Sequence, residues 1–164
     1  METTNHGRAR FSPVCAWLAG AALITFSLTL PAFAALGGDE SSVHTDQAHM
    51  KASIKTTAGP AYTMHEIKTP AGNIVREFVS GDGRVFAVAW RGPSMPPMQQ
   101  ILGSYFQQFS AGTQAHHAVH VGRRPLNIQQ PGLVVQSNGH PRGFFGRAYV
   151  PGMLPAGISA DEIR

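Results

Sequence analysis

Three histidines that stand close together are the residues of this chain best suited to bind a metal. His116, His117 and His120 share one short stretch, and imidazole is a common ligand of divalent metals. On a helix, His116 and His120 would share a face and could hold one ion, whereas on a strand they would stand about 13 Å apart. The zinc-protease motif requires a glutamate directly after its first histidine, but His117 occupies that place. A divalent-metal site without a catalytic base is therefore one hypothesis for this stretch.

Glu66 and Glu77 offer a different chemistry, because glycoside hydrolysis requires a pair of carboxyl groups. They lie in two predicted strands of one hairpin, and a turn centred between Ala71 and Gly72 would place them opposite each other. Like charges that face each other destabilise a sheet. A shift of one residue pairs Glu66 with Arg76 instead. We favour this cross-strand ion pair over a small hydrolase built on the two glutamates.

Trp90, Arg91 and Tyr105 are a third candidate, an aromatic and cationic patch at the end of a predicted strand. A shallow patch of this kind suits a peptide or a glycan. The alternative is that Trp90 caps the core while Arg91 lies along it, with its aliphatic stem buried and its charged head in water. The general burial of tryptophan favours this alternative. The stretch "VFAVAWRGP" (85–93) is therefore predicted to be mainly a core strand.

Common catalytic motifs are otherwise missing from the sequence. No serine stands in a G-x-S-x-G elbow, and there is no phosphate-binding loop. The stretch "GDGRVF" (81–86) begins like a dinucleotide-binding motif, but Phe86 replaces its third glycine and no helix follows. We therefore predict no catalytic residue and no cofactor, with a divalent metal as the alternative.

Apolar patterns predict the strands that would position these groups. Residues 61–91 contain three apolar runs separated by turn sequences, as in an antiparallel meander. The third run is apolar on both faces, which indicates an interior strand. Its larger face carries Phe86, Val88 and Trp90, and its smaller face carries Ala87 and Ala89. Residues 132–150 predict a second hairpin.

An amphipathic stripe predicts one helix over residues 98–109. Its apolar residues recur at helical spacing: Met98, Ile101, Leu102, Tyr105, Phe106 and Phe109. We expect this helix to pack on the alanine face of the third strand, and Gly103 to weaken it by about 1 kcal/mol relative to alanine. A thin stripe indicates a further helix within residues 39–55. The segment 110–131, rich in Gly, His and Gln, is predicted to be irregular.

The composition limits the partners of the chain. It has 164 residues and a formal net charge of +4, and its basic residues are scattered. Nucleic-acid binding requires a clustered basic stripe with interleaved aromatic residues, so we predict no nucleic-acid partner. The single cysteine, Cys15, lies in the N-terminal segment. The rest of the chain therefore has no disulfide and no thiol nucleophile.

The first 34 residues have the pattern of a cleavable secretory leader. Arg8 and Arg10 make its start basic, an apolar stretch follows, and "PAFAA" (31–35) supplies an A-x-A cleavage site. We predict cleavage between Ala34 and Ala35, which leaves residues 35–164 as a single domain. The expected location is periplasmic or secreted, with no membrane span after cleavage. The oligomeric state stays open.

Six short motifs spread over nearly the whole predicted mature chain resemble a family of short exported proteobacterial proteins. They are "LGGD" (36–39), "VREF" (75–78), "VFAVAWRGP" (85–93), "LGSYF" (102–106), "GRAYVP" (146–151) and "LPAG" (154–157). The resemblance implies export and one compact domain. The family has no established function, so the resemblance supplies no catalytic residues to map. The histidine tract lies between these motifs.

These observations predict an α+β domain. Its antiparallel sheet would have about five strands, from the meander 61–91 and the hairpin 132–150, with the helix 98–109 packed on it. We predict an exported, non-catalytic protein that binds a partner protein or an envelope component such as a glycan. The alternative is a periplasmic metal-binding protein that uses His116, His117 and His120.

Overall fold

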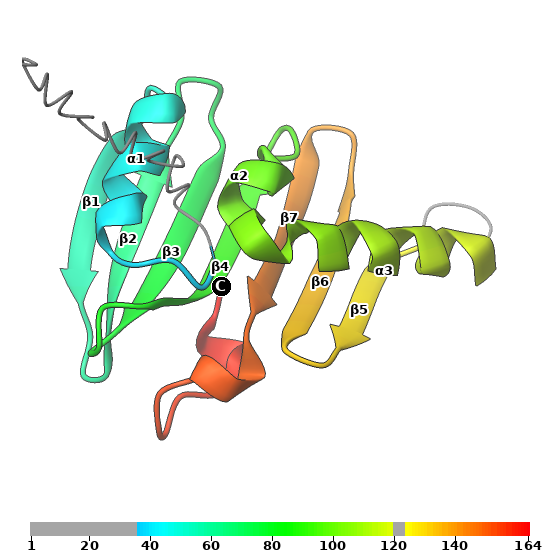
Figure 1. The fold of residues 1–164 in the computed structure, drawn as a ribbon. Helices are drawn as coiled ribbons and strands as arrows, with labels where there is room; N and C mark the ends of the chain where they lie inside the picture. Colours follow the sequence, from blue (N-terminus) through cyan, green and yellow to red (C-terminus); the bar gives the residue numbers. More distant parts are fainter. Residues whose placement is uncertain (1–35, 120–123) are drawn as a thin grey trace, which may run out of the picture.

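The computed structural model describes residues 36–119 and 124–164, which form one seven-stranded antiparallel sheet with helices on one face (Figure 1). The strand order is β1-β2-β3-β4-β7-β6-β5. The strands are β1 (Ser53–Ala58), β2 (Tyr62–Lys68), β3 (Ile74–Ser80), β4 (Val85–Gly92), β5 (Leu126–Gln130), β6 (Leu133–His140) and β7 (Gly143–Tyr149). The helices are α1 (Ser41–His49), α2 (Met98–Leu102) and α3 (Phe106–Val119), with short 3-10 turns at Gly103–Tyr105, Pro151–Met153 and Ala160–Glu162. The predicted leader, its cleavage site between Ala34 and Ala35, and His120 lie outside the described residues.

Two antiparallel meanders meet at the centre of the sheet. Strands β1 to β4 form the first and β5 to β7 form the second, and β4 pairs with β7. Between them, α2 and α3 carry the chain from β4 across one face to the far edge, where β5 begins (Figure 1). The predicted α+β class with an antiparallel sheet is confirmed. The number of strands is seven, not about five.

Strand β1 is one of the two strands that the sequence analysis missed. The helix expected within residues 39–55 ends at His49, and Lys51 adopts a φ of 48°. This left-handed conformation cannot continue a right-handed helix. The following residues, "SIKTTA" (53–58), include three β-branched side chains, which favour a strand, and they pair along the full length of β1 with β2.

The other missed strand, β5, follows a helical segment that is longer than predicted. This segment begins at Met98 as expected, turns at Gly103 (φ 47°) and continues as α3 to Val119. The segment 110–131 is therefore not irregular, since it contains the second half of α3 and all of β5. Gly112 is buried where α3 crosses β5, and a Cβ there would lie 2.7 Å from Ile128 Cγ2. This glycine lets α3 approach β5 closely, and it does not interrupt the helix.

The helix-bearing side of the sheet contains the larger apolar core. Val88 and Trp90 of β4 are buried there together with Ile101 and Leu102 of α2. All six apolar residues of the predicted amphipathic stripe belong to this core or pack against it. The helix therefore packs on the face of β4 that carries Val88 and Trp90, and not on the alanine face.

A β-bulge in β4 determines what covers the alanine face. Phe78 pairs with Ala87 but Val79 pairs with Val85, so Phe86 is an extra residue in the ladder. Its side chain joins Ala87 and Ala89 in a second core on the side away from the helices. The C-terminal tail packs there, with Ile163 buried and with Leu154 and Ile158 beside it. We call this side of the sheet, opposite the helices, the open face.

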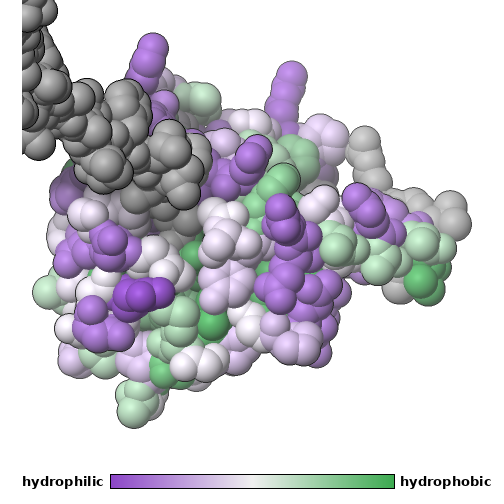
Figure 2. All heavy atoms as spheres, viewed as in Figure 1, coloured by the Kyte–Doolittle hydropathy of each residue, from purple (hydrophilic) through white to green (hydrophobic). Residues whose placement is uncertain are grey.

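The surface on the helix-bearing side mixes hydrophilic and hydrophobic residues (Figure 2). Hydrophobic residues are visible at the far end of α3, where Val119 is 77% exposed. None of the helices within residues 36–119 and 124–164 is long and apolar enough to cross a membrane.

Candidate functional site

The structure separates the three residues of the predicted aromatic and cationic patch. Trp90 is 3% exposed on the helix-bearing side, and a Cβ on Gly146 would stand only 2.5 Å from its Cζ2. Tyr105 packs into the same core. Arg91 follows Trp90 along β4, so its side chain points to the open face, where it is exposed. Trp90 is therefore a core residue, and Arg91 alone remains at a surface.

Arg91 lines a hollow of about 680 Å³ on the open face. The floor lies at the centre of the sheet, where the small Ala89 stands between Arg76 and Arg147 in the cross-strand register. Strands β5 and β6 add the amide side chains of Asn127, Gln136 and Asn138, and the tail adds Ile163 and Arg164. The small residue at the centre of this row leaves room for a ligand.

A second hollow, of about 600 Å³, adjoins the first. The two hollows share Ile74, Arg91 and Phe145, which stand in one row across β3, β4 and β7. His140, the last residue of β6, and Arg142, in the turn between β6 and β7, also line the second hollow. We call the two hollows together the open-face groove.

Positive charge dominates the lining of this groove. Five arginines line it, namely Arg76, Arg91, Arg142, Arg147 and Arg164. No aspartate or glutamate is among the residues that line either hollow. This cluster could not be recognised from the sequence, because its members are far apart along the chain.

Arg76 is held in a fixed position at the floor of the groove. Its Nε and Nη2 each lie 2.8 Å from Glu66 Oε2, and its Nη1 donates to the backbone oxygen of Arg164 at 2.7 Å. The predicted ion pair between Glu66 and Arg76 is thereby confirmed. Glu77 pairs with His65 in the register and lies on the opposite face from Glu66, so the two glutamates do not form the paired site of a glycosidase.

Arg147 is fixed in a similar way on the other side of Ala89. Its Nε donates to Gln136 Oε1 at 2.8 Å, and its Nη1 donates to the backbone oxygen of Ala160. Its Nη2 lies 3.3 Å from the exposed carboxylate of Asp161. These contacts tie β7 to β6 and to the tail, so Arg147 forms a rigid wall whose charge is partly neutralised.

Arg91 and Arg142 differ from these two arginines, because neither has a hydrogen bond or ion pair within the described part of the chain. Arg91 faces Phe145 across the ladder between β4 and β7, and Phe145 is 54% exposed. Arg142 has a φ of 73°, a left-handed conformation that glycine adopts far more readily. Strained backbone positions of this kind cluster at ligand sites. The open-face groove is therefore the best candidate for a ligand site.

The two described histidines of the predicted metal site lie in the last turn of α3. The rings of His116 and His117 are 5.9 Å apart and edge to face. Consecutive helical residues point about 100° apart, so these two side chains do not converge on one ion by themselves. His120, the third predicted ligand, lies outside the described residues. Within the described ranges, no three His, Cys, Asp or Glu side chains gather as a metal site requires. The metal site stays a prediction.

A pair of buried carboxyl groups lies between α1 and the sheet. Asp46 of α1 and Glu77 of β3 are both fully buried, and Gln100 Nε2 of α2 donates to Asp46 Oδ1 at 2.6 Å. Burial raises the pKa of Asp46 to about 6. Burial, and then the charge of Asp46, raise the pKa of Glu77 well above its ordinary value. Two neighbouring buried carboxyl groups of this kind do not easily ionise together.

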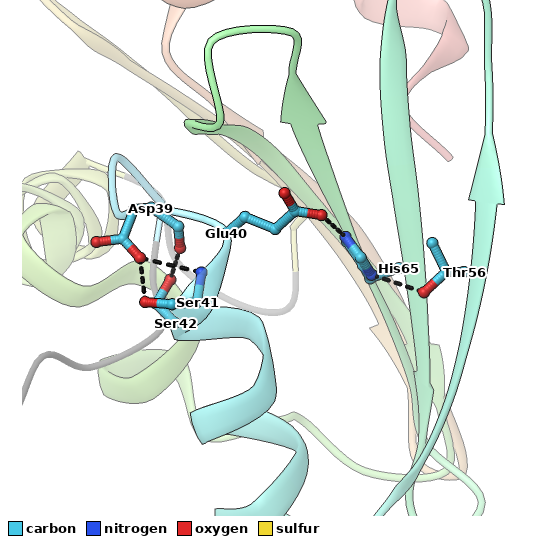
Figure 3. A network of polar contacts seen from close by, with 6 residues as sticks. All are labelled: Asp39, Glu40, Ser41, Ser42, Thr56 and His65. Atoms are coloured by element: carbon cyan, nitrogen blue, oxygen red, sulfur yellow. Dashed lines mark hydrogen bonds and ion pairs between the residues drawn. The ribbon is translucent and has the colours of Figure 1, made fainter.

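A third polar group connects the start of α1 to the edge of the sheet (Figure 3). His65 Nε2 of β2 lies 3.1 Å from Glu40 Oε1, and His65 Nδ1 lies 3.0 Å from Thr56 Oγ1 of β1. The order of acid, imidazole and hydroxyl is that of a catalytic triad. Neither hollow includes any of the three residues, and the Glu40 carboxylate is about half exposed. The geometry fits a structural tie between α1 and the first two strands.

Comparison with known proteins places the chain in a family. No curated protein and no solved structure matches it. One family model matches residues 32–163, a span that contains every strand and helix described above and every groove-lining residue except Arg164. The chain therefore belongs to the family described as "Protein of unknown function (DUF2844)".

Proposed function

We propose that this protein is a non-catalytic binding module of the cell envelope that takes an anionic ligand in the open-face groove. The predicted leader supports an envelope location, either periplasmic or secreted. The groove supports binding, because ligand sites are usually concave and combine apolar side chains with a small number of placed polar groups.

The single observation that carries this proposal is the environment of Arg91. Its guanidinium has no partner within residues 36–119 and 124–164, it lies beside the exposed ring of Phe145, and no aspartate or glutamate side chain lines the hollows that it enters. An arginine that only stabilised the fold would be expected to pair, as Arg76 and Arg147 do. Arg91 is instead available to an external anion, to which its planar group can donate two hydrogen bonds at once.

The groove is poorly equipped for catalysis. Its lining contains no aspartate or glutamate, and His140 is the one histidine among its residues. His140 is exposed at a turn, with its Nδ1 3.0 Å from the backbone oxygen of Pro141. A general acid and base pair is therefore not present in the groove, which favours binding without turnover.

The proposal is tested by retention of the mature protein on insoluble envelope material over a range of salt concentrations. The test variant is Arg91→Gln, and the matched control is Lys55→Gln. Lys55 is an exposed cation on the same sheet face, outside both hollows. We expect the wild type and the control to be retained at low salt and released at high salt, because exposed charges are screened. Arg91→Gln should be released at clearly lower salt. Equal retention of all three proteins would show that the open-face groove does not hold the protein on the envelope material.

Metal binding is a second candidate function, favoured by the helical conformation of the chain as far as Val119. If the helix continued, His116 and His120 would share one face, as a two-histidine site on a helix requires. A divalent metal bound to the mature protein in stoichiometric amount, and lost from the double variant His116→Ala and His120→Ala, would support this function.

A further inference from the structure

We infer that the ligand of the open-face groove is an acidic glycan, a polymer of sugars that bear carboxylates, lying extended through both hollows. This inference rests on the proposed function and specifies its ligand. It uses three properties of the groove, namely its charge, its length and the chemical groups that it offers.

The charge of the groove requires an anionic occupant. Five arginines line the two hollows without a lining aspartate or glutamate, although the whole chain has 13 basic and 9 acidic residues. Arg76 and Arg147 have part of their charge balanced by Glu66 and Asp161, but Arg91 and Arg142 do not. Arg91 stands where the hollows meet, and Arg142 lines only the second hollow. A ligand with repeated negative charges would therefore match both.

The continuity of the two hollows favours an extended ligand. They share the row of Ile74, Arg91 and Phe145, so a chain that enters one can continue into the other. At one end the path reaches the tail residues Ile163 and Arg164, and at the other it reaches the β6–β7 turn. An extended anion could therefore contact Arg91 where the hollows meet and Arg142 in the second hollow.

The groups along the path suit a sugar polymer better than an acidic peptide. Peptides commonly bind a sheet by adding a strand to its edge, where backbone N–H and C=O groups are unpaired. The groove floor is instead made by β3, β4 and β7, each of which pairs with a strand on both sides. At this floor, side chains are therefore the groups available for recognition. The amides of Asn127, Gln136 and Asn138 can bond to hydroxyl groups.

Phe145 completes the match to a sugar. Its exposed ring stands beside Arg91 in the cross-strand register, so one sugar unit could stack its apolar face on the ring while its carboxylate reaches the guanidinium. A lipid surface is a poorer match, because membrane association requires a broad, contiguous apolar face. In the lining of the groove, Phe145 is the one large hydrophobic side chain that is strongly exposed.

The direct test is affinity electrophoresis of the full mature chain with defined soluble polymers. The acidic glycan probe is polygalacturonate. The comparison probes are neutral dextran, poly-L-glutamate and vesicles of phosphatidylglycerol with phosphatidylcholine. Arg91→Gln, Arg142→Gln and Phe145→Ser alter the groove, and Lys55→Gln is the control. All four positions are exposed, so the variants should fold, which thermal unfolding verifies.

We expect binding to polygalacturonate and none to dextran. Each groove variant should bind about tenfold more weakly or worse, the effect of losing one charge-assisted hydrogen bond or one aromatic contact. Lys55→Gln should bind like the wild type. Loss of binding on Phe145→Ser separates the glycan from a purely electrostatic contact, because that substitution leaves the charge unchanged.

Two other outcomes would overturn the inference, and they have different consequences for the proposed function. Tighter, Arg91-dependent binding to polyglutamate or to the anionic vesicles would overturn the glycan ligand and leave an anion-binding groove. If the protein bound none of the anionic probes, and if Arg91→Gln did not change its retention on envelope material, both the ligand and the proposed function would be overturned.

Discussion

Arg91 and Phe145 face each other across the ladder that joins β4 to β7, which is also the seam between the two meanders of the sheet. Each residue belongs to a different meander, so the pair exists only when the whole sheet has formed. The apolar face of Phe145 and the unpaired charge of Arg91 lie on the open face, where no helix covers them. This seam therefore joins the two halves of the fold and carries the proposed ligand site.

The planar geometry of Arg91 should matter as much as its charge. Lysine keeps the positive charge but offers a point charge in place of a fork of two parallel donors. We expect Arg91→Lys to bind polygalacturonate with an affinity between those of the wild type and Arg91→Gln, about threefold to tenfold weaker than the wild type. Affinity electrophoresis at one fixed salt concentration gives the dissociation constants of the three proteins and so ranks their affinities. Equal affinity of Arg91→Lys and the wild type would mean that charge alone acts.

Much of the fold follows from local patterns, but the groove does not. The stripe from Met98 to Phe109 and the runs around Val75 and Val88 predict their elements because apolar spacing is a local property. β1 and β5 are short edge strands, and their pairing depends on distant neighbours. Gly112 resembled a loop residue, since its contact with Ile128 is tertiary.

The candidate site also could not be predicted from local patterns, because the pairing of distant strands assembles it. Arg76 and Arg147 come together only because β4 pairs with both β3 and β7 and places Ala89 between them. The sequence did identify Arg91 as a candidate, but it grouped this residue with Trp90, which points to the other face by the alternation of a strand. Application of that alternation to "GFFGRAYV" (143–150) would have placed Phe145 and Arg147 on one face.

Gly146 should be essential for the packing of Trp90. A Cβ at this position would lie 2.5 Å from Trp90 Cζ2 and 2.6 Å from the backbone oxygen of Gln136, and neither neighbour can move without disturbing the core. We expect Gly146→Ala to lower the free energy of unfolding by about 1 to 3 kcal/mol, as measured by urea denaturation. Gly81→Ala is the control, because a Cβ there meets nothing within 4 Å, and it should change stability by less than about 0.5 kcal/mol. Equal stability of the two variants would contradict the close contact with Trp90.

The buried pair of Asp46 and Glu77 should make the protein less stable as the pH rises. Both carboxyl groups have raised pKa values in the folded protein, with Asp46 at about 6, and ordinary values near 4 in the unfolded chain. The folded state therefore binds more protons than the unfolded state in this range, so their contribution to stability is complete at low pH and is lost as the pH rises through the folded pKa values.

Glu77→Gln tests this pH dependence, because glutamine retains the shape of the side chain but has no ionisable carboxyl group. We expect the variant to lose less stability than the wild type between about pH 5 and pH 8, as measured by thermal unfolding at several pH values. Glu66→Gln is the control, since it removes a half-buried carboxylate of the same type on the opposite face. That variant should retain the slope of the wild type. A wild-type slope in Glu77→Gln would show that the pair does not titrate in this range.

The mature protein should contain no stoichiometric metal when it is purified from its envelope fraction, since His116 and His117 diverge on α3. Native mass spectrometry with elemental analysis measures this directly. The opposite result would be a bound divalent metal that is lost from the double variant His116→Ala and His120→Ala but retained in His44→Ala, a change at an exposed histidine of α1. That result would make metal binding the leading function.

Arg142 should trade stability for binding. Its φ of 73° is a conformation that costs a non-glycine residue about 1 kcal/mol or more, and glycine would relieve this strain. We expect Arg142→Gly to raise the free energy of unfolding by about 1 kcal/mol and to weaken binding to polygalacturonate as much as Arg142→Gln does. The glutamine variant retains the strained backbone, so its stability should stay near that of the wild type. Denaturation and affinity electrophoresis on the same three proteins separate the two effects. If Arg142→Gly were more stable and bound as tightly as the wild type, the strain at this turn would have no role in ligand binding, and the groove would end at Arg91.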